Sequence, residues 1–289
     1  MTDSTPFGAT TTAMVTPFDA DGDLDPDAAA ALAAHLVDSG CDGLVLSGTT
    51  GESPVTTDAE KTVLLRAVLE AVGDRATVTA GVGTYDTRHS AELARQAEKA
   101  GAHGVLAVTP YYSRPSQDGV VAHFRAVADA TGLPVMLYDI PRRSGIPIDL
   151  DSYRRLAEHP RVAGVKDARG DLLFGSRVMA ETGLTYLCGD DPLTLPWLSV
   201  GAAGVVSVAA HAVPGRVRDL VRAARADDLA TARAVHTDLV PLYSVIEATG
   251  GVPFAKAALE LTGHRAGPPR LPNTPATPDQ LDAIRTVLA

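Results

Sequence analysis

Residues 104–138 read GVLAVTPYYSRPSQDGVVAHFRAVADATGLPVMLY and contain one full copy of a pattern that recurs along the chain. Residues 104–108 are a short apolar run typical of a buried strand, and residues 134–138 form a second such run. The stretch between them has helical character, and Thr131-Gly132 after it is a typical helix stop. The pattern predicts a unit in which a helix joins two parallel strands.

The same unit recurs at spacings of about 20 to 30 residues. Eight β-rich or apolar runs mark it, at residues 10–15, 43–46, 77–80, 104–108, 134–138, 162–166, 185–188 and 204–207. Eight alternating βα units are typical of a (β/α)8 barrel, whereas a doubly wound sheet usually has fewer strands. The glycine fingerprint of the doubly wound fold is also missing, because two residues and a glycine do not follow Gly81-Val82-Gly83. We therefore predict an α/β TIM barrel.

Helix signals stand between the runs where this fold requires them. Asp25-Pro26 supplies an N-cap and a proline at the first helical position. Thr57 and Glu60 have the spacing of a capping box ahead of an apolar stretch. These signals predict helices that begin close to residues 26 and 58.

The pattern changes after the eighth run. Residues 214–262 are helical in character, residues 267–278 are rich in proline, and residues 279–288 form a last predicted helix. This remainder is longer than one closing helix needs. We expect a barrel over residues 1–224, which carries the active site, and a C-terminal helical extension over residues 225–289.

Composition limits the possible partners. The chain has 289 residues, with 25 Lys and Arg against 35 Asp and Glu, and the resulting net charge of -10 disfavours nucleic acid as a partner. No apolar run approaches the length of about 20 residues that a bilayer-spanning helix needs, and the first residues lack a signal-peptide pattern. The expected location is the cytoplasm, with no membrane partner. Eight scattered histidines and two cysteines without CxxC spacing give no support for a metal site.

Lys166 is the most informative residue at the strand ends, which form the active mouth of such a barrel. It terminates the run VAGVK, and the chain contains only four lysines. A lysine enclosed by apolar walls is more easily neutral, and a neutral amine can attack a ketone to form a Schiff base. The alternative is a lysine that reaches the barrel mouth and pairs with Asp167. Position alone favours neither interpretation.

Other polar groups follow neighbouring strands, and each has a structural alternative. Tyr138 can pass protons to and from a lysine, or it can be an amphipathic rim residue. The hydroxyls of Thr49 and Thr50, in a loop between two glycines, can hold a carboxylate or simply stabilise a tight turn. Arg143 can grip a carboxylate with two parallel hydrogen bonds, but the adjacent Arg142 is equally placed to do so.

Two aspartates follow the seventh strand in the sequence GDDP. Asp191 directly precedes Pro192, which is the usual arrangement of an N-cap with proline at the first helical position. We therefore expect Asp191 to cap a helix, and we assign no catalytic role to it or to Asp190.

Read together, the motifs AMVTPF, SGTTGES, VTPYYSRPS, LYDIPRRSG, GVKDA, CGDD and GVVSV cover nearly the whole chain. Their order and spacing resemble those of the dihydrodipicolinate synthase family. This family belongs to the pyruvate-dependent class I aldolases, which also include N-acetylneuraminate lyase. GTTGE together with the arginine after YDIP favours the synthase branch over the neuraminate branch.

The resemblance implies a catalytic set of four residues: Lys166, Tyr138, Thr50 and Tyr112. Lys166 would form a Schiff base with pyruvate, and Tyr138 would relay protons. Thr50 and Tyr112 would complete the relay, with Tyr112 reaching into the pocket of a neighbouring subunit across a dimer interface.

The resemblance also implies a substrate-binding set: Thr49, Thr50, Arg143, Gly189 and Val206. The two threonines would hold the carboxylate of pyruvate, and Arg143 would hold that of L-aspartate 4-semialdehyde. Gly189 and Val206 would line the pyruvate pocket through their backbone.

The implied reaction condenses these two substrates to 4-hydroxy-tetrahydrodipicolinate, on the diaminopimelate route to lysine. It needs no cofactor besides the covalent Schiff base, and the implied assembly is a homotetramer built as a dimer of dimers. The alternative is a related pyruvate-dependent aldolase or lyase that acts on a sugar acid or another 2-keto acid.

The chain departs from the feedback-inhibited members of the family at the positions where those members bind lysine. Two histidines and an asparagine expected there are matched by Asp58, Lys61 and Tyr85, and an expected acidic residue is replaced by His89. This departure predicts weak or absent inhibition by lysine.

Overall fold

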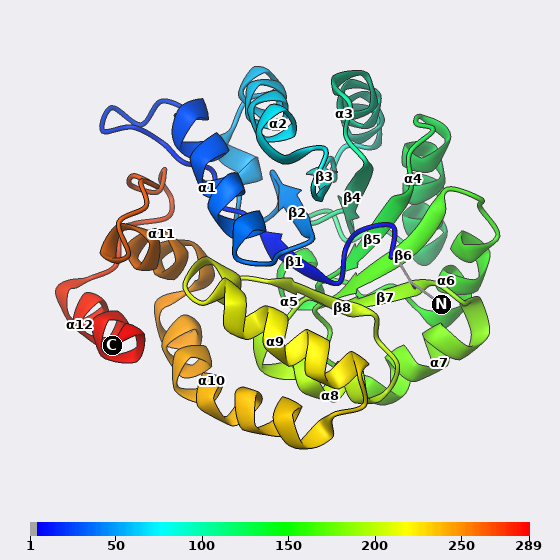
Figure 1. Cartoon of the computed structure of the whole chain (residues 1–289). Coiled ribbons are helices and arrows are strands. Elements are labelled where there is room, and N and C mark those ends of the chain that lie inside the picture. Colours follow the sequence, from blue (N-terminus) through cyan, green and yellow to red (C-terminus); the bar gives the residue numbers. More distant parts are fainter. Residues whose placement is uncertain (1–4) are drawn as a thin grey trace.

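The computed structural model describes residues 5–289 as a closed parallel barrel of eight strands, in which each strand pairs with the next and β8 pairs with β1 (Figure 1). The strands are β1 (Thr10–Ala13), β2 (Gly43–Leu46), β3 (Thr77–Gly81), β4 (Gly104–Val108), β5 (Val135–Asp139), β6 (Val162–Asp167), β7 (Thr185–Cys188) and β8 (Gly204–Ser207). The predicted TIM barrel is confirmed.

Eight main helices alternate with the strands and surround the barrel in Figure 1. They are α1 (Pro26–Asp38), α2 (Asp58–Val72), α3 (Thr87–Ala100), α4 (Gln117–Asp129), α6 (Leu150–Ala157), α7 (Leu172–Thr182), α8 (Thr194–Ser199) and α9 (Pro214–Arg225). Short elements lie in the loops, namely α5 (Pro141–Ser144) and the 3-10 turns η1 (Ser53–Val55), η2 (Asp191–Leu193) and η3 (Ala209–His211). No helix among residues 5–289 has both the length and the apolar character needed to cross a bilayer.

The predicted helix starts are present with the expected chemistry. The side chain of Asp25 accepts a hydrogen bond from the Ala28 amide at the start of α1. Both hydrogen bonds of the capping box between Thr57 and Glu60 are formed at the start of α2. Local sequence therefore fixes where these two helices begin.

Asp191 is not the helix cap that its place before Pro192 predicts. It is the first residue of η2, and its carboxylate accepts hydrogen bonds from the Val208 and Ala209 amides at 2.8 and 3.0 Å and from the Ser207 hydroxyl. A buried carboxylate gains more from these three donors, at the end of β8 and just after it, than from one donor in a single turn of 3-10 helix. The expectation that this residue caps its own helix is wrong, and no signal near it in the sequence indicates the donors.

The interior of the barrel is filled by side chains, with Phe7 at the end where the strands begin. Its ring contacts the backbone of Gly104 and Gly164, where an added Cβ would lie 3.0 and 2.9 Å from ring carbons. Phe7 is fully buried, and the apolar layer above it includes Met136, Leu187 and Val206. The barrel is therefore closed at this end and leaves the opposite mouth for a site.

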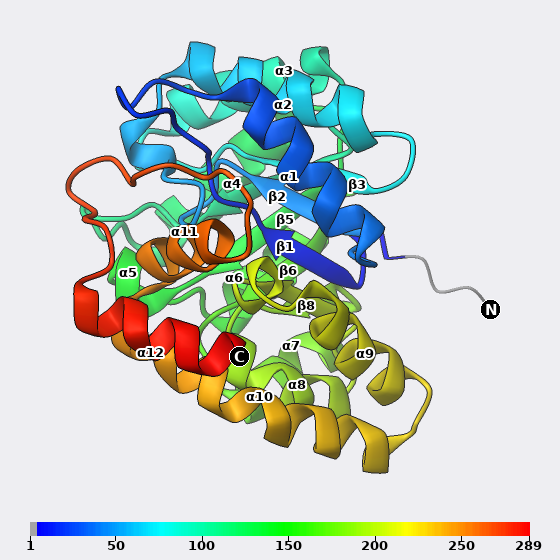
Figure 2. The ribbon, with the colours of Figure 1, turned by 60° about the vertical axis from the view of Figure 1, so that its left-hand side comes forward.

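Three helices follow the barrel: α10 (Leu229–Thr249), α11 (Gly251–Leu261) and α12 (Pro278–Leu288). Figure 2 shows α10 beside α9, and the loop after α11 passing the segment that leads from β1 to α1. The amide of Phe18 in that segment donates to the carbonyl of Ala266 at 3.1 Å. The predicted helical extension is present, and the division at residues 224 and 225 remains a prediction.

Candidate active site

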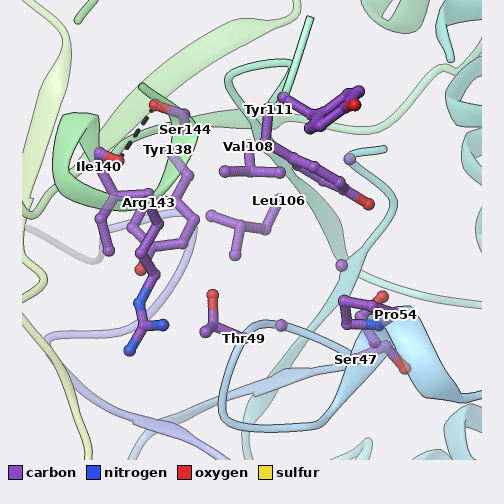
Figure 3. A pocket seen from close by; sticks show the side chains of 15 residues that line it. Ser47, Thr49, Pro54, Leu106, Val108, Tyr111, Tyr138, Ile140, Arg143 and Ser144 are labelled. Carbon is purple, nitrogen blue, oxygen red and sulfur yellow. Dashed lines mark hydrogen bonds between the residues drawn. The ribbon is translucent and has the colours of Figure 1, made fainter. Parts of the chain in front are cut away.

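A pocket of about 360 Å³ opens at the carboxyl ends of β2 to β5 (Figure 3). Its walls carry four of the predicted site residues, namely Thr49, Tyr112, Tyr138 and Arg143. The other four, Thr50, Lys166, Gly189 and Val206, are not among the residues that line it. The position agrees with the rule that TIM-barrel sites lie at the C-terminal face.

Lys166 and Tyr138 are cross-strand neighbours on β6 and β5, and their Cα atoms are paired in the register of the two strands. Side chains at paired positions of adjacent strands point to the same face, which here is the barrel interior. The Nζ of Lys166 lies 4.4 Å from the centroid of the Tyr138 ring, and both residues are buried. Because Tyr138 also lines the pocket, the lysine lies directly behind the pocket wall.

Asp167 is not the partner of Lys166. As the next residue of β6, it points to the outer face of the barrel. There its carboxylate accepts hydrogen bonds from the Tyr186 hydroxyl at 2.6 Å and from the amides of Arg169 and Gly170. Lys166 forms no salt bridge within residues 5–289. The alternative interpretation of Lys166 as the partner of Asp167 therefore has no support in the structure.

Asp139 and Asp167 form a buried acidic pair on this outer face, directly behind Tyr138 and Lys166. Burial raises the pKa of Asp139 to about 7, and the nearby charge of Asp167 acts in the same direction. The Tyr153 hydroxyl donates to Asp139 at 3.2 Å. Because strand residues alternate between faces, these acids are separated from the barrel interior by the strands themselves.

The loop that carries the two threonines is conformationally constrained. Ser47 and Glu52, at its two ends, both have left-handed backbones, with φ of 52° and 55°. Gly51 has no room for a side chain, since a Cβ there would lie 2.9 Å from the Ser47 amide nitrogen. The loop places Thr49 on the pocket wall, whereas Thr50 is buried and does not line the pocket. This distinction could not be made from the sequence.

The two arginines after β5 have different partners. Arg143 lines the pocket, where Figure 3 shows it beside Tyr138. Arg142 instead forms a salt bridge with Asp190, at 3.5 Å. The short helix α5 sets this difference, because consecutive residues of a helix point in different directions. Arg143 is therefore the one available for a substrate carboxylate.

Two tyrosines after β4 stand at the rim of the pocket. Tyr112 is 93% exposed and has a left-handed backbone, with φ of 68°. Tyr111, which sequence reasoning did not select, also lines the pocket and contacts the ring of Tyr85 edge-on at 5.5 Å. Burial raises the pKa of the Tyr111 hydroxyl. The tyrosine doublet at a strand end was the available signal for both residues.

Gly189 lies beside Lys166, and Val206 lies in the barrel interior. A Cβ at position 189 would lie 3.0 Å from Cγ of Lys166, so the absence of a side chain leaves room for the lysine. Val206 is buried in the same interior cluster as Tyr138. The structure therefore brings Lys166, Tyr138 and Gly189 together, with Thr49 and Arg143 on the pocket wall above them.

Comparison with known proteins places the chain in a family. The model of the dihydrodipicolinate synthetase family matches residues 6–289. The 4-hydroxy-tetrahydrodipicolinate synthase of Mycolicibacterium paratuberculosis is 59% identical over 278 residues, which are 96% of this chain and 93% of that protein. The synthase of Acidothermus cellulolyticus is 58% identical, over 98% of this chain and 92% of that protein.

Solved structures agree over almost the whole length. A dihydrodipicolinate synthase from Bacillus anthracis has a TM-score of 0.94 and 38% identity, and the match covers 98% of this chain and 97% of that one. A dihydrodipicolinate synthase from Acinetobacter baumannii, solved in complex with pyruvate, has a TM-score of 0.94 and 31% identity, with 98% of both chains covered. The chain belongs to the dihydrodipicolinate synthetase family.

Proposed function

We propose that the chain performs its 4-hydroxy-tetrahydrodipicolinate synthase activity, a lyase activity, through a Schiff base between Lys166 and pyruvate. The activity is that of its full-length relatives. The observation that carries the proposed mechanism is the Lys166 amine 4.4 Å from the centre of the Tyr138 ring, behind the pocket wall. The match to a synthase solved in complex with pyruvate supports pyruvate as the first substrate.

The chemistry begins when the neutral Lys166 amine attacks the keto carbon of pyruvate. Loss of water gives a protonated imine, which withdraws electrons from the adjacent methyl group. A methyl proton leaves, and the resulting enamine attacks the aldehyde carbon of L-aspartate 4-semialdehyde to form the new carbon–carbon bond. The amine of this second substrate then attacks the imine carbon, closes the ring and releases Lys166 as a free amine.

Proton transfer in these steps requires hydroxyl groups close to the lysine. Tyr138 supplies one, because a phenol both donates and accepts a proton. We assign the threonine of the relay to Thr49 rather than Thr50, because Thr49 is the one that lines the pocket. Thr50 then contributes to the carboxylate site of pyruvate through the loop that it shares with Thr49.

The second substrate brings its own carboxylate, which Arg143 holds at the mouth of the pocket. A guanidinium there supplies positive charge to a protein whose net charge is -10. Tyr112 completes the relay in a neighbouring subunit, a role supported by its 93% exposure and its fixed left-handed backbone. We propose a homotetramer made of two such dimers as the assembly, in line with the family resemblance.

Borohydride reduction in the presence of pyruvate tests the mechanism. Intact-protein mass spectrometry should show one pyruvate-derived adduct, and peptide mapping should place it on Lys166. Lys99→Ala removes a lysine of α3 and serves as the control, since the adduct should form in it unchanged. A wild-type enzyme that is active but gives no adduct, or an adduct on another lysine, would exclude the proposed Schiff base.

Lysine should inhibit the enzyme weakly or not at all. The groups that replace the family's lysine-binding residues already contact one another, since His89 and Asp58 form a hydrogen bond of 3.0 Å. Lys61 adds a cation to the same region, which repels the ammonium groups of lysine. A titration of activity with L-lysine checks this expectation, and half-maximal inhibition well below 1 mM would contradict it.

A further inference from the structure

Glu52 ends the loop that presents Thr49, and its side chain is turned away from the pocket into the protein. The side chain is fully buried, which is costly for a carboxylate unless charged or polar groups compensate it. Its Oε1 lies 3.3 Å from Nζ of Lys256, and its Oε2 accepts a hydrogen bond of 2.9 Å from the backbone amide of Arg270. Both partners belong to the C-terminal extension, more than 200 residues away in sequence.

Lys256 lies on α11 and is also buried, with 3% of its side chain exposed. Besides facing Glu52, its ammonium donates hydrogen bonds of 3.1 and 3.0 Å to the carbonyls of Ala266 and Pro268. The same nitrogen lies 4.3 Å from the centroid of the Phe18 ring. Burial lowers the pKa of Lys256 to about 8, and the charge of Glu52 acts in the opposite direction. The ammonium group thus links α11, the loop after α11 and the end of the loop that carries Thr49 and Thr50.

Arg270 reinforces the same junction from the other side. Its guanidinium donates to the carbonyls of Gly22 and Val55, both at 2.9 Å, and forms an ion pair with Glu60 at the start of α2. It also stacks over the Phe18 ring, with its central carbon 4.1 Å from the centroid. The loop after α11 is therefore fixed to the body of the barrel, and its backbone amide at residue 270 is a rigid donor for Glu52.

The loop from Ser47 to Glu52, which carries Thr49 and Thr50, needs such support because its conformation is unfavourable in isolation. A left-handed backbone at a residue other than glycine is strained and persists only where the surroundings hold it. Ser47 and Glu52 both carry this strain, at the two ends of the segment that contains Thr49 and Thr50. Two hydrogen bonds also hold the loop. The Thr16 hydroxyl donates to the Gly51 carbonyl at 2.6 Å, and the Glu52 amide donates to the Thr49 carbonyl at 3.2 Å.

We propose that Lys256 of the C-terminal extension is a positioning residue of the active site, which acts through Glu52 to hold the Thr49–Thr50 loop in its carboxylate-binding conformation. It also neutralises a negative charge two residues from Thr50, which would otherwise repel the carboxylate of pyruvate. This inference rests on the proposed function of the loop as the pyruvate carboxylate site. It gives the extension a part in catalysis although none of its residues lines the pocket.

Lys256→Met tests the proposal, because it keeps most of the side-chain volume and removes the charge. The pyruvate concentration for half-maximal borohydride trapping should rise about tenfold or more, since displaced binding groups cost up to about a hundredfold. Adduct formation at saturating pyruvate should remain, because Lys166 is untouched. Lys99→Met is the matched control: it makes the same substitution on α3, away from this junction, and should leave the half-saturating pyruvate concentration within about twofold.

A second variant keeps the test valid if Lys256→Met does not fold. Glu52→Gln retains the side-chain shape and the hydrogen bond from the Arg270 amide but removes the ion pair with Lys256. It should raise the half-saturating pyruvate concentration by a similar factor. The double variant should match Glu52→Gln alone, because Lys256 then has no carboxylate to hold. The proposal would be overturned if the half-saturating pyruvate concentration were unchanged in both single variants. It would also be overturned if the two single effects multiplied in the double variant. A wild-type protein without an adduct would instead overturn the proposed function itself.

Discussion

Lys166→Ala should lower kcat/KM by at least about a thousandfold, since the covalent intermediate can no longer form. The lysine lies beside Tyr138 in the barrel interior, and within residues 5–289 no other lysine lines the pocket to replace it. Of the other three lysines, Lys61 and Lys99 lie on α2 and α3, and Lys256 is buried with Glu52. A coupled assay with both substrates measures the loss.

Lys166→Arg is the control for charge and burial. An arginine keeps the positive charge in the barrel interior, but its guanidinium stays protonated and cannot attack a ketone. We expect it to be as inactive as Lys166→Ala and to give no adduct on borohydride reduction. Activity within about tenfold of wild type in either variant would show that the amine is not the nucleophile.

Arg143→Ala should raise the KM for L-aspartate 4-semialdehyde and lower kcat/KM for this substrate by about a hundredfold. Two charge-assisted hydrogen bonds to a carboxylate contribute about 3 kcal/mol together, which corresponds to that factor. The pyruvate adduct should still form, because Lys166, Tyr138 and Thr49 remain in place. Steady-state kinetics with each substrate varied in turn separate these two effects.

Arg142→Ala is the matched control, because Arg142 is adjacent in sequence but pairs with Asp190 instead of lining the pocket. It should change kcat/KM by less than about fivefold, since exposed ion pairs contribute about 0 to 1 kcal/mol. A larger effect from Arg142 than from Arg143 would contradict the assignment. An Arg143→Ala enzyme that keeps full activity with L-aspartate 4-semialdehyde would show that Arg143 does not hold the carboxylate of this substrate.

The barrel and the central pair of residues could be predicted because their signals are local and periodic. The run VAGVK predicts a strand whose lysine lies near the mouth, and Tyr138 occupies the matching position of the preceding strand, one residue before its end. Strand register then places the two side chains together without knowledge of any distant contact. The capping residues of α1 and α2 were predictable for the same reason, since each cap involves residues at most three apart.

The remaining parts of the site depend on information that neighbouring residues do not carry. The choice between Thr49 and Thr50 depends on the fold of a strained loop, and the choice between Arg142 and Arg143 depends on a one-turn helix. The partners of Glu52 come from residues 256 and 270, and no spacing rule connects them to it. Contacts of this kind follow from tertiary packing alone.

Because Phe7 fills the barrel where the strands begin, substrates reach the site from the opposite end. In the proposed mechanism, both substrates, the released water and the product therefore pass through this mouth. The lysine lies at depth and Arg143 lies at the mouth. In the proposed mechanism, pyruvate binds first because it forms the Schiff base with the deeper Lys166, and the semialdehyde then binds at Arg143 near the mouth. The closed base thus gives entry and release a shared route, so the product has to leave before the next pyruvate can reach Lys166.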